Sequence, residues 1–114
     1  VQLHPYGLSD RPHTASQVFN QTVLKDEPGD IECRTLDSYN FTNIDFIKID
    51  VDGFEIPLLQ GARRTLETNS AVISIEMKTD KRPGIVANAV AILQSVGYRQ
   101  VSRVRSDEVW LKSI

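Results

Sequence analysis

The chain has 114 residues, of which 40% are hydrophobic and 25% charged, with a formal net charge of −2. This composition is typical of a folded domain and predicts a single domain over residues 1–114 with a core of its own. The scattered basic residues argue against nucleic-acid binding. The lone Cys33 cannot form an internal disulfide, and no apolar run approaches the roughly 18 residues of a membrane helix. We therefore expect a cytoplasmic protein without membrane contact.

The N-terminal third carries weak structural signals. We expect a short strand within residues 1–8 and a turn through residues 7–12. Residues 13–30 are polar and weakly patterned, with a loop signal near Pro28 and Gly29. Residues 31–36 alternate between apolar and polar side chains, which predicts a half-exposed strand. The next four residues, 37–40, favour a turn or the start of a short helical segment.

The strongest signal is the run Ile44-Asp-Phe-Ile-Lys-Ile-Asp-Val-Asp-Gly-Phe-Glu55. Its apolar, β-branched part predicts a strand over residues 45–50, and the strand ends abruptly in carboxylates and a glycine. Buried parallel strands are short apolar runs, and ligands in open α/β sheets bind beyond the carboxyl ends of the strands. We therefore expect Asp50, Asp52 and Glu55 at the edge of the sheet where chemistry takes place.

The remaining chain alternates helices with strands. Pro57 suits the first turn of a helix that ends near residues 68–70. The apolar face of that helix is expected to consist of Leu58, Leu59, Ala62 and Leu66. Residues 71–76 read as a second buried strand. A second helix is expected over residues 85–96, with Gly97 as its C-terminal cap.

Strands over residues 98–104 and 108–112 then form an antiparallel hairpin. From residue 45 onward the order is strand, helix, strand, helix, strand, strand. Strands that alternate with helices predict an α/β fold with parallel pairing through right-handed crossovers. Glu76 ends the second strand of this series, so its carboxylate should lie at the same edge as Asp50.

Two interpretations of the acidic edge remain open. The carboxylates of Asp50, Asp52 and Glu55 are suited to orienting a substrate hydroxyl, acting as a general base or holding a cation. Alternatively, the two aspartates cap the following helix while Gly53 permits the turn. Lys78 either contacts an anionic substrate or lies in a solvated loop. An EF-hand alignment fails at its first and last ligand positions, and we expect no metal site.

Four segments together resemble the FkbM family of methyltransferases. They are Thr35-Leu-Asp37, the run from Ile44 to Glu55, Leu58-Leu-Gln-Gly-Ala62 and Val72-Ile-Ser-Ile-Glu76. Asp52 stands where the family usually has Glu, which keeps the charge on a shorter side chain. The segment Gly7-Leu-Ser-Asp10 also resembles the turn after the third strand of that family.

The resemblance implies a Rossmann-like methyltransferase sheet, mostly parallel with a C-terminal antiparallel hairpin, and S-adenosylmethionine (SAM) as methyl donor. Residues 45–50 and 71–76 would be its fourth and fifth strands. Together with the strand-end positions, it suggests six site residues: catalytic Asp50, Asp52 and Glu55, substrate-binding Glu76 and Lys78, and cofactor-binding Asp10. The implied substrate is a hydroxyl of a small molecule or sugar.

The chain departs from the family pattern in one respect. The family's first strand, its glycine-rich turn and its second strand should precede residue 1, and the sequence contains no G-x-G-x-x-G turn. We therefore expect a truncated, C-terminal portion that is inactive alone; the alternative is an inactive structural or interaction module. Without the first strand, the fourth would have an open edge. Either residues 1–36 cover that edge or two copies pair there, and we expect a homodimer.

Overall fold

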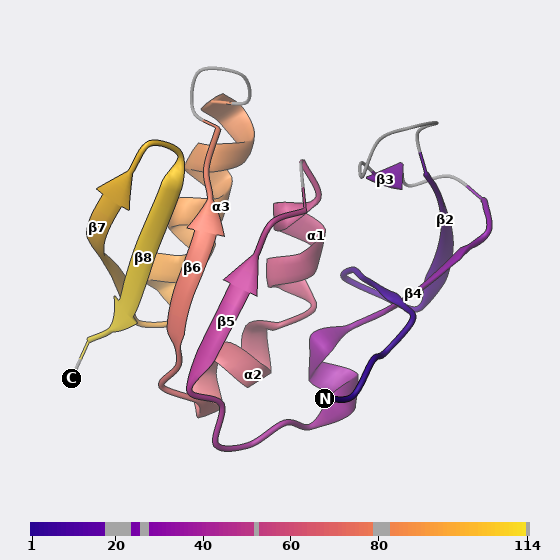
Figure 1. The fold of residues 1–114 in the computed structure, drawn as a ribbon, viewed down its shortest axis with the longest axis horizontal. Helices are drawn as coiled ribbons and strands as arrows, with labels where there is room; N and C mark the ends of the chain where they lie inside the picture. Colours follow the sequence, from indigo (N-terminus) through magenta and orange to yellow (C-terminus); the bar gives the residue numbers. More distant parts are fainter. Residues whose placement is uncertain (18–23, 26–27, 52, 79–82, 114) are drawn as a thin grey trace.

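The strands form two four-stranded sheets in the computed structural model, which describes residues 1–17, 24–25, 28–51, 53–78 and 83–113 (Figure 1). The N-terminal sheet has the order β1-β4-β2-β3 and consists of β1 (Gly7–Leu8), β2 (His13–Gln17), β3 (Leu24–Lys25) and β4 (Ile31–Arg34). The C-terminal sheet has the order β5-β6-β8-β7 and consists of β5 (Phe46–Ile49), β6 (Val72–Glu76), β7 (Tyr98–Val104) and β8 (Asp107–Lys112). The helices are the 3₁₀ helix η1 (Leu36–Tyr39), α1 (Glu55–Gln60), α2 (Arg63–Thr68) and α3 (Pro83–Ser95).

The C-terminal sheet contains the predicted parallel pair. β5 and β6 run parallel, with Phe46 opposite Val72 and Ile49 opposite Ile75. The predicted hairpin of β7 and β8 is also present, and β8 pairs antiparallel with β6. The expectation of a mostly parallel sheet is wrong, because the hairpin inserts its second strand beside β6 and makes the sheet mixed. The fold is therefore mixed α/β.

The core lies between the C-terminal sheet and the helices, which cover one of its faces (Figure 1). Strand residues alternate between faces, so Ile73, Ile75 and Trp110 point to the helices and are almost fully buried. On the opposite face Phe46 is 58% exposed. Among the described residues, no helix is long and apolar enough to cross a membrane.

The predicted single helix after Pro57 is wrong in one respect, because the chain forms two short helices. The interruption falls at Gly61 and Ala62. A Cβ at Gly61 would lie 1.9 Å from the backbone oxygen of Ser9, so the N-terminal segment crosses the helix where only a glycine fits. The predicted apolar face is nevertheless confirmed: its four members are all buried, namely Leu58, Leu59, Ala62 and Leu66.

The C-terminal end of α2 is held by side chains from distant parts of the chain. Asn69 donates through Nδ2 to the carbonyl of Thr65 (2.9 Å), and Lys112 Nζ donates to the carbonyls of Leu66 (3.0 Å) and Asn69 (2.9 Å). These donors satisfy carbonyls that the helix end leaves without partners. The Tyr98 hydroxyl also donates to Asn69 (3.2 Å), and burial raises the pKa of Tyr98.

The remaining helix, α3, agrees with the sequence. It extends two residues further toward the N-terminus than predicted. Gly97 follows its end with φ +91°, a conformation that favours glycine, and donates its N–H to Gln94.

The N-terminal sheet was only partly predicted. β1 and β4 lie in the predicted strand regions, whereas β2 and β3 fall in a stretch without a strand signal. β2 pairs antiparallel with β4, so that Ala15 lies opposite Ile31. Ala15 and Cys33 are buried in this sheet. Its interior is therefore built from small side chains, which give little hydrophobic periodicity.

Two glycine substitutions test the close contact at Gly61. Gly61→Ala should lower the free energy of unfolding by more than about 2 kcal/mol, because the new Cβ meets the Ser9 backbone and forces it to move. Gly84→Ala is the matched control: nothing lies within 4 Å of its Cβ position in α3. It should leave stability unchanged or raise it by up to about 1 kcal/mol. Urea unfolding measures both values, and equal effects would contradict the packing.

Candidate functional site

Acidic residues end two neighbouring strands of the C-terminal sheet. Because Ile49 is paired with Ile75, the residues that follow, Asp50 and Glu76, lie at the same edge of the sheet, as predicted. Asp50 is exposed, whereas the Glu76 side chain is 25% exposed and forms an ion pair with Lys78, with Nζ 3.2 Å from Oε1. The two predicted substrate-binding residues are therefore in contact with each other at this edge.

The other two predicted catalytic carboxylates have different positions. Glu55 is the first residue of α1 and is buried, so its carboxylate is less accessible to a substrate than that of Asp50. Asp52 lies outside the described residues. The residue at the N-cap position of α1 is Phe54, which forms no side-chain capping hydrogen bond. The interpretation of Asp50 as the cap of this helix therefore receives no support. Asp50 is thus the most accessible described member of this set.

A cavity of about 250 Å³ lies beside Asp50, between the edges of the two sheets. Gly7 and Leu8 of β1 form one side, and Asp50 and Val51 after β5 form the other. The remaining lining is apolar and comes from Tyr6, Phe54 and Leu58. In the described part of the chain, β1 and β5 each have a pairing partner on one side only. The cavity therefore lies where two strand edges are open.

The predicted cofactor residue Asp10 belongs to a polar cluster after β1. Its Oδ1 accepts from the buried Ser9 hydroxyl (3.1 Å) and from Arg11 Nη1 (2.9 Å). His13 Nε2 lies 2.7 Å from Ser9 Oγ, and its Nδ1 lies 2.8 Å from the carbonyl oxygen of Thr14. The carboxylate of Asp10 is thus held by its neighbours. His13 was not singled out in the sequence, because it carries no ligand spacing there.

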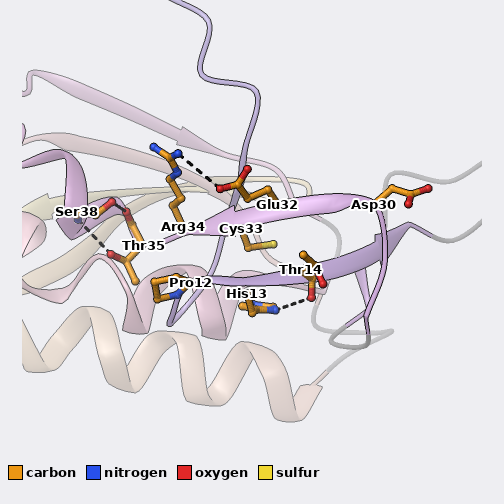
Figure 2. Close-up of a pocket in the computed structure, with 9 residues that line it drawn as sticks. All are labelled: Pro12, His13, Thr14, Asp30, Glu32, Cys33, Arg34, Thr35 and Ser38. Carbon is orange, nitrogen blue, oxygen red and sulfur yellow. Dashed lines mark hydrogen bonds and ion pairs between the residues drawn. The ribbon is translucent and has the colours of Figure 1, made fainter.

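A larger cavity, of about 610 Å³, lies along β2 and β4 (Figure 2). Its lining carries both signs of charge, hydroxyl groups and one thiol, from Pro12, His13, Thr14, Asp30, Glu32, Cys33, Arg34, Thr35 and Ser38. Arg34 forms an ion pair with Glu32, with Nη2 3.6 Å from Oε1. The central carbon of its guanidinium lies 3.7 Å from the centroid of the Tyr6 ring. Such a lining offers both donors and acceptors, so it suits a polar ligand.

Asp37 has a structural role. Its Oδ1 accepts from the N–H (2.7 Å) and hydroxyl (2.7 Å) of Thr65, and its Oδ2 accepts from the N–H of Arg64 (3.1 Å). These N–H groups belong to the first turn of α2, where no intrahelical acceptor is available. Asp37 therefore caps α2 from a distant position in the chain. Within the described ranges, no group of three or more His, Cys, Asp or Glu residues is arranged to hold a metal ion.

The fold and the site together define a mixed α/β protein with acidic residues at the ends of a parallel strand pair. The family model of the methyltransferase FkbM domain matches residues 7–100. The chain therefore belongs to the FkbM methyltransferase domain family, as the sequence resemblance predicted. No curated protein and no solved structure matches the chain.

Alanine substitutions separate the two kinds of acidic residue in the family segments. Asp37→Ala should lower the free energy of unfolding by about 1–3 kcal/mol, because it removes the cap of α2 and leaves donors without a partner. The exposed Asp50 is the control: Asp50→Ala should change stability by no more than about 0.5 kcal/mol. Urea unfolding distinguishes them, and a larger loss for Asp50→Ala would assign that carboxylate a structural role.

Proposed function

We propose that this chain is the acceptor-binding part of a SAM-dependent methyltransferase with a Rossmann-like sheet, which methylates a hydroxyl of a small molecule or sugar. The observation that supports this most is the accessible carboxylate of Asp50 beside the cavity between β1 and β5, in a member of the FkbM methyltransferase domain family. The neighbouring Glu76 and Lys78 add one charge of each sign.

In this proposal Asp50 is the general base. A hydroxyl oxygen becomes a better nucleophile when its proton is accepted by a positioned carboxylate at hydrogen-bond distance. Asp50 would accept that proton as the oxygen takes the methyl group, and the donor sulfur would leave as a neutral thioether. Glu76 and Lys78 would orient the acceptor through further hydrogen bonds. Glu55, which is buried, would act on the acceptor less directly than Asp50.

The residues of this chain fit only part of the cofactor. When bound, SAM supplies an electrophilic methyl group. Asp10, held by Ser9 and Arg11, would bind polar atoms on one side of SAM. The six glycines of the sequence form no G-x-G-x-x-G turn, which is the element that lets a backbone approach a nucleotide. The glycine-rich part of the cofactor site would therefore come from outside these 114 residues.

The cavity in Figure 2 supports a polar acceptor. His13 lines this cavity and contacts Ser9, which in turn contacts Asp10. Hydroxyl groups and charges of both signs match the alternating donors and acceptors of a polyhydroxylated molecule. A volume of about 610 Å³ is within the range of small-molecule sites. In this proposal the polar groups would bind the hydroxyl groups of a sugar, within a lining that is mostly apolar by area.

Substitution of Asp50 in the active methyltransferase tests the proposed base. Asp50→Asn should lower the rate of methyl transfer from SAM about 100-fold or more, with SAM affinity unchanged, because an amide cannot accept the proton. Radiolabelled methyl transfer gives the rate, and calorimetry gives the affinity. Asp45→Asn, at the opposite end of the same strand, is the control and should retain activity. A fully active Asp50→Asn protein would exclude this base.

A second candidate function is a homodimeric structural or interaction module without catalysis. The open edge of β5 favours it, because an unpaired strand edge is a template for another chain. Val72 donates to the carbonyl of Asp45, so the backbone groups of alternate residues, including Lys48, point to the open edge. Two copies of β5 would then form a continuous sheet across the dimer.

Light scattering tests this pairing with a proline on the open edge. The wild-type chain should be a dimer and Lys48→Pro a monomer, because proline removes an outward N–H without breaking the ladder to β6. Lys48→Thr is the control and should remain dimeric. A wild-type chain that stays monomeric at high concentration would contradict pairing through β5.

Calorimetry with SAM separates the two functions: micromolar binding by this chain would argue against the non-catalytic module.

A further inference from the structure

A third cavity, of about 140 Å³, is lined by residues of the N-terminal segment and of η1. The N-terminal segment passes beside η1 (Figure 1). Its lining is aromatic and aliphatic and comes from His4, Tyr6, Leu8, Leu36, Tyr39 and Phe41. It shares Tyr6 and Leu8 with the cavity beside Asp50. None of the six residues predicted as site residues lines it.

The aromatic side chains of this cavity are arranged around a stacked pair. The rings of Tyr39 and Phe41 are nearly parallel, with an interplanar angle of 7° and centroids 5.2 Å apart. The His4 ring meets Tyr39 edge-on, at 71° and 4.8 Å. Aromatic faces and edges carry opposite partial charges, so such a cluster favours a further ring in a stacked or edge-on position.

The Tyr39 hydroxyl is the unusual polar group of this region. It is buried and has no hydrogen-bond partner among the residues that the structure describes. Buried hydroxyl groups are almost always hydrogen-bonded, so an exception indicates a missing partner. A water molecule needs two to four polar neighbours. Among the other lining residues only His4 and Tyr6 carry polar side-chain atoms, and neither forms a hydrogen bond with this hydroxyl.

We propose that this cavity binds a planar aromatic ring system that carries a hydrogen-bonding atom on its edge. The ring would pack against His4 and Phe41, and its polar atom would pair with the Tyr39 hydroxyl. A volume of about 140 Å³ suits a ligand of one or two fused rings. A quaternary ammonium ion also binds aromatic surfaces, but it has no hydrogen-bonding atom and would leave the Tyr39 hydroxyl without a partner. Binding at this cavity is separate from the proposed methyl transfer and does not depend on it.

A pair of probe molecules tests the site. Quinoline and naphthalene have the same shape, but only quinoline has a ring nitrogen that accepts a hydrogen bond. The wild-type chain should bind quinoline about tenfold more tightly than naphthalene, the effect of roughly one hydrogen bond. Tyr39→Phe keeps the aromatic ring and should remove the difference. NMR titration that follows the Tyr39 and Phe41 rings measures both affinities. Equal affinities in the wild type, binding of neither probe, or tighter binding of tetramethylammonium would overturn the proposal.

Unfolding without ligand tests the unpaired hydroxyl separately. Tyr39→Phe should leave the midpoint of urea unfolding unchanged or raise it, because the substitution removes a buried group without a partner. Tyr98→Phe is the matched control. Its hydroxyl donates to Asn69, so the midpoint should fall. A fall of the same size for Tyr39→Phe would mean that water or the protein already satisfies the hydroxyl, which would also overturn the proposal.

Discussion

The hydrogen bonds of Asp37 hold the two halves of this fold together. Asp37 lies in η1, directly after the N-terminal sheet, and its N–H donates to the carbonyl of Gly61 (2.9 Å). Its carboxylate caps α2, whose Leu66 belongs to the core and accepts through its carbonyl from Lys112 of β8. Beside it, the backbone of Ser9 rests on Gly61. Because Asp10 follows Ser9 directly, these contacts determine where the proposed cofactor residue lies relative to the acidic edge.

The C-terminal sheet could be predicted because its information is local. Each buried strand is a continuous apolar run. The buried positions of Ile49, Ile73 and Ile75 could therefore be predicted without knowing which strands lie beside them. The helix between β5 and β6 implies parallel pairing, and parallel pairing brings the strand ends to one edge. The proximity of Asp50 and Glu76 therefore followed from sequence pattern alone. The hairpin of β7 and β8 could also be predicted from a short stretch of sequence, since one short turn joins its strands.

The remaining features depend on contacts between distant segments. β2 has no strand signal because its buried Ala15 is small and its neighbours are polar. The break between α1 and α2 arises because Ser9, more than 50 positions away in the chain, crosses at Gly61. The share of parallel pairing was overestimated, because hydrophobic periodicity does not show which strand of the hairpin pairs with β6. In the structure it is β8, which runs antiparallel to β6. The cluster of Ser9 and His13 was missed for a similar reason: its residues form no familiar motif.

The family segments of this chain divide into two physical roles. Asp37 and Gly61 form the junction of the two halves, and the fold alone explains why those residue types are required. Asp50 is different, because an exposed carboxylate at a strand end contributes little to stability. Folding therefore does not account for a carboxylate at that position, whereas the proton transfer that we propose beside the cavity would account for it. The position of Asp50 thus favours the proposed methyl transfer over a structural module, and the open edge of β5 is compatible with dimer formation in either case.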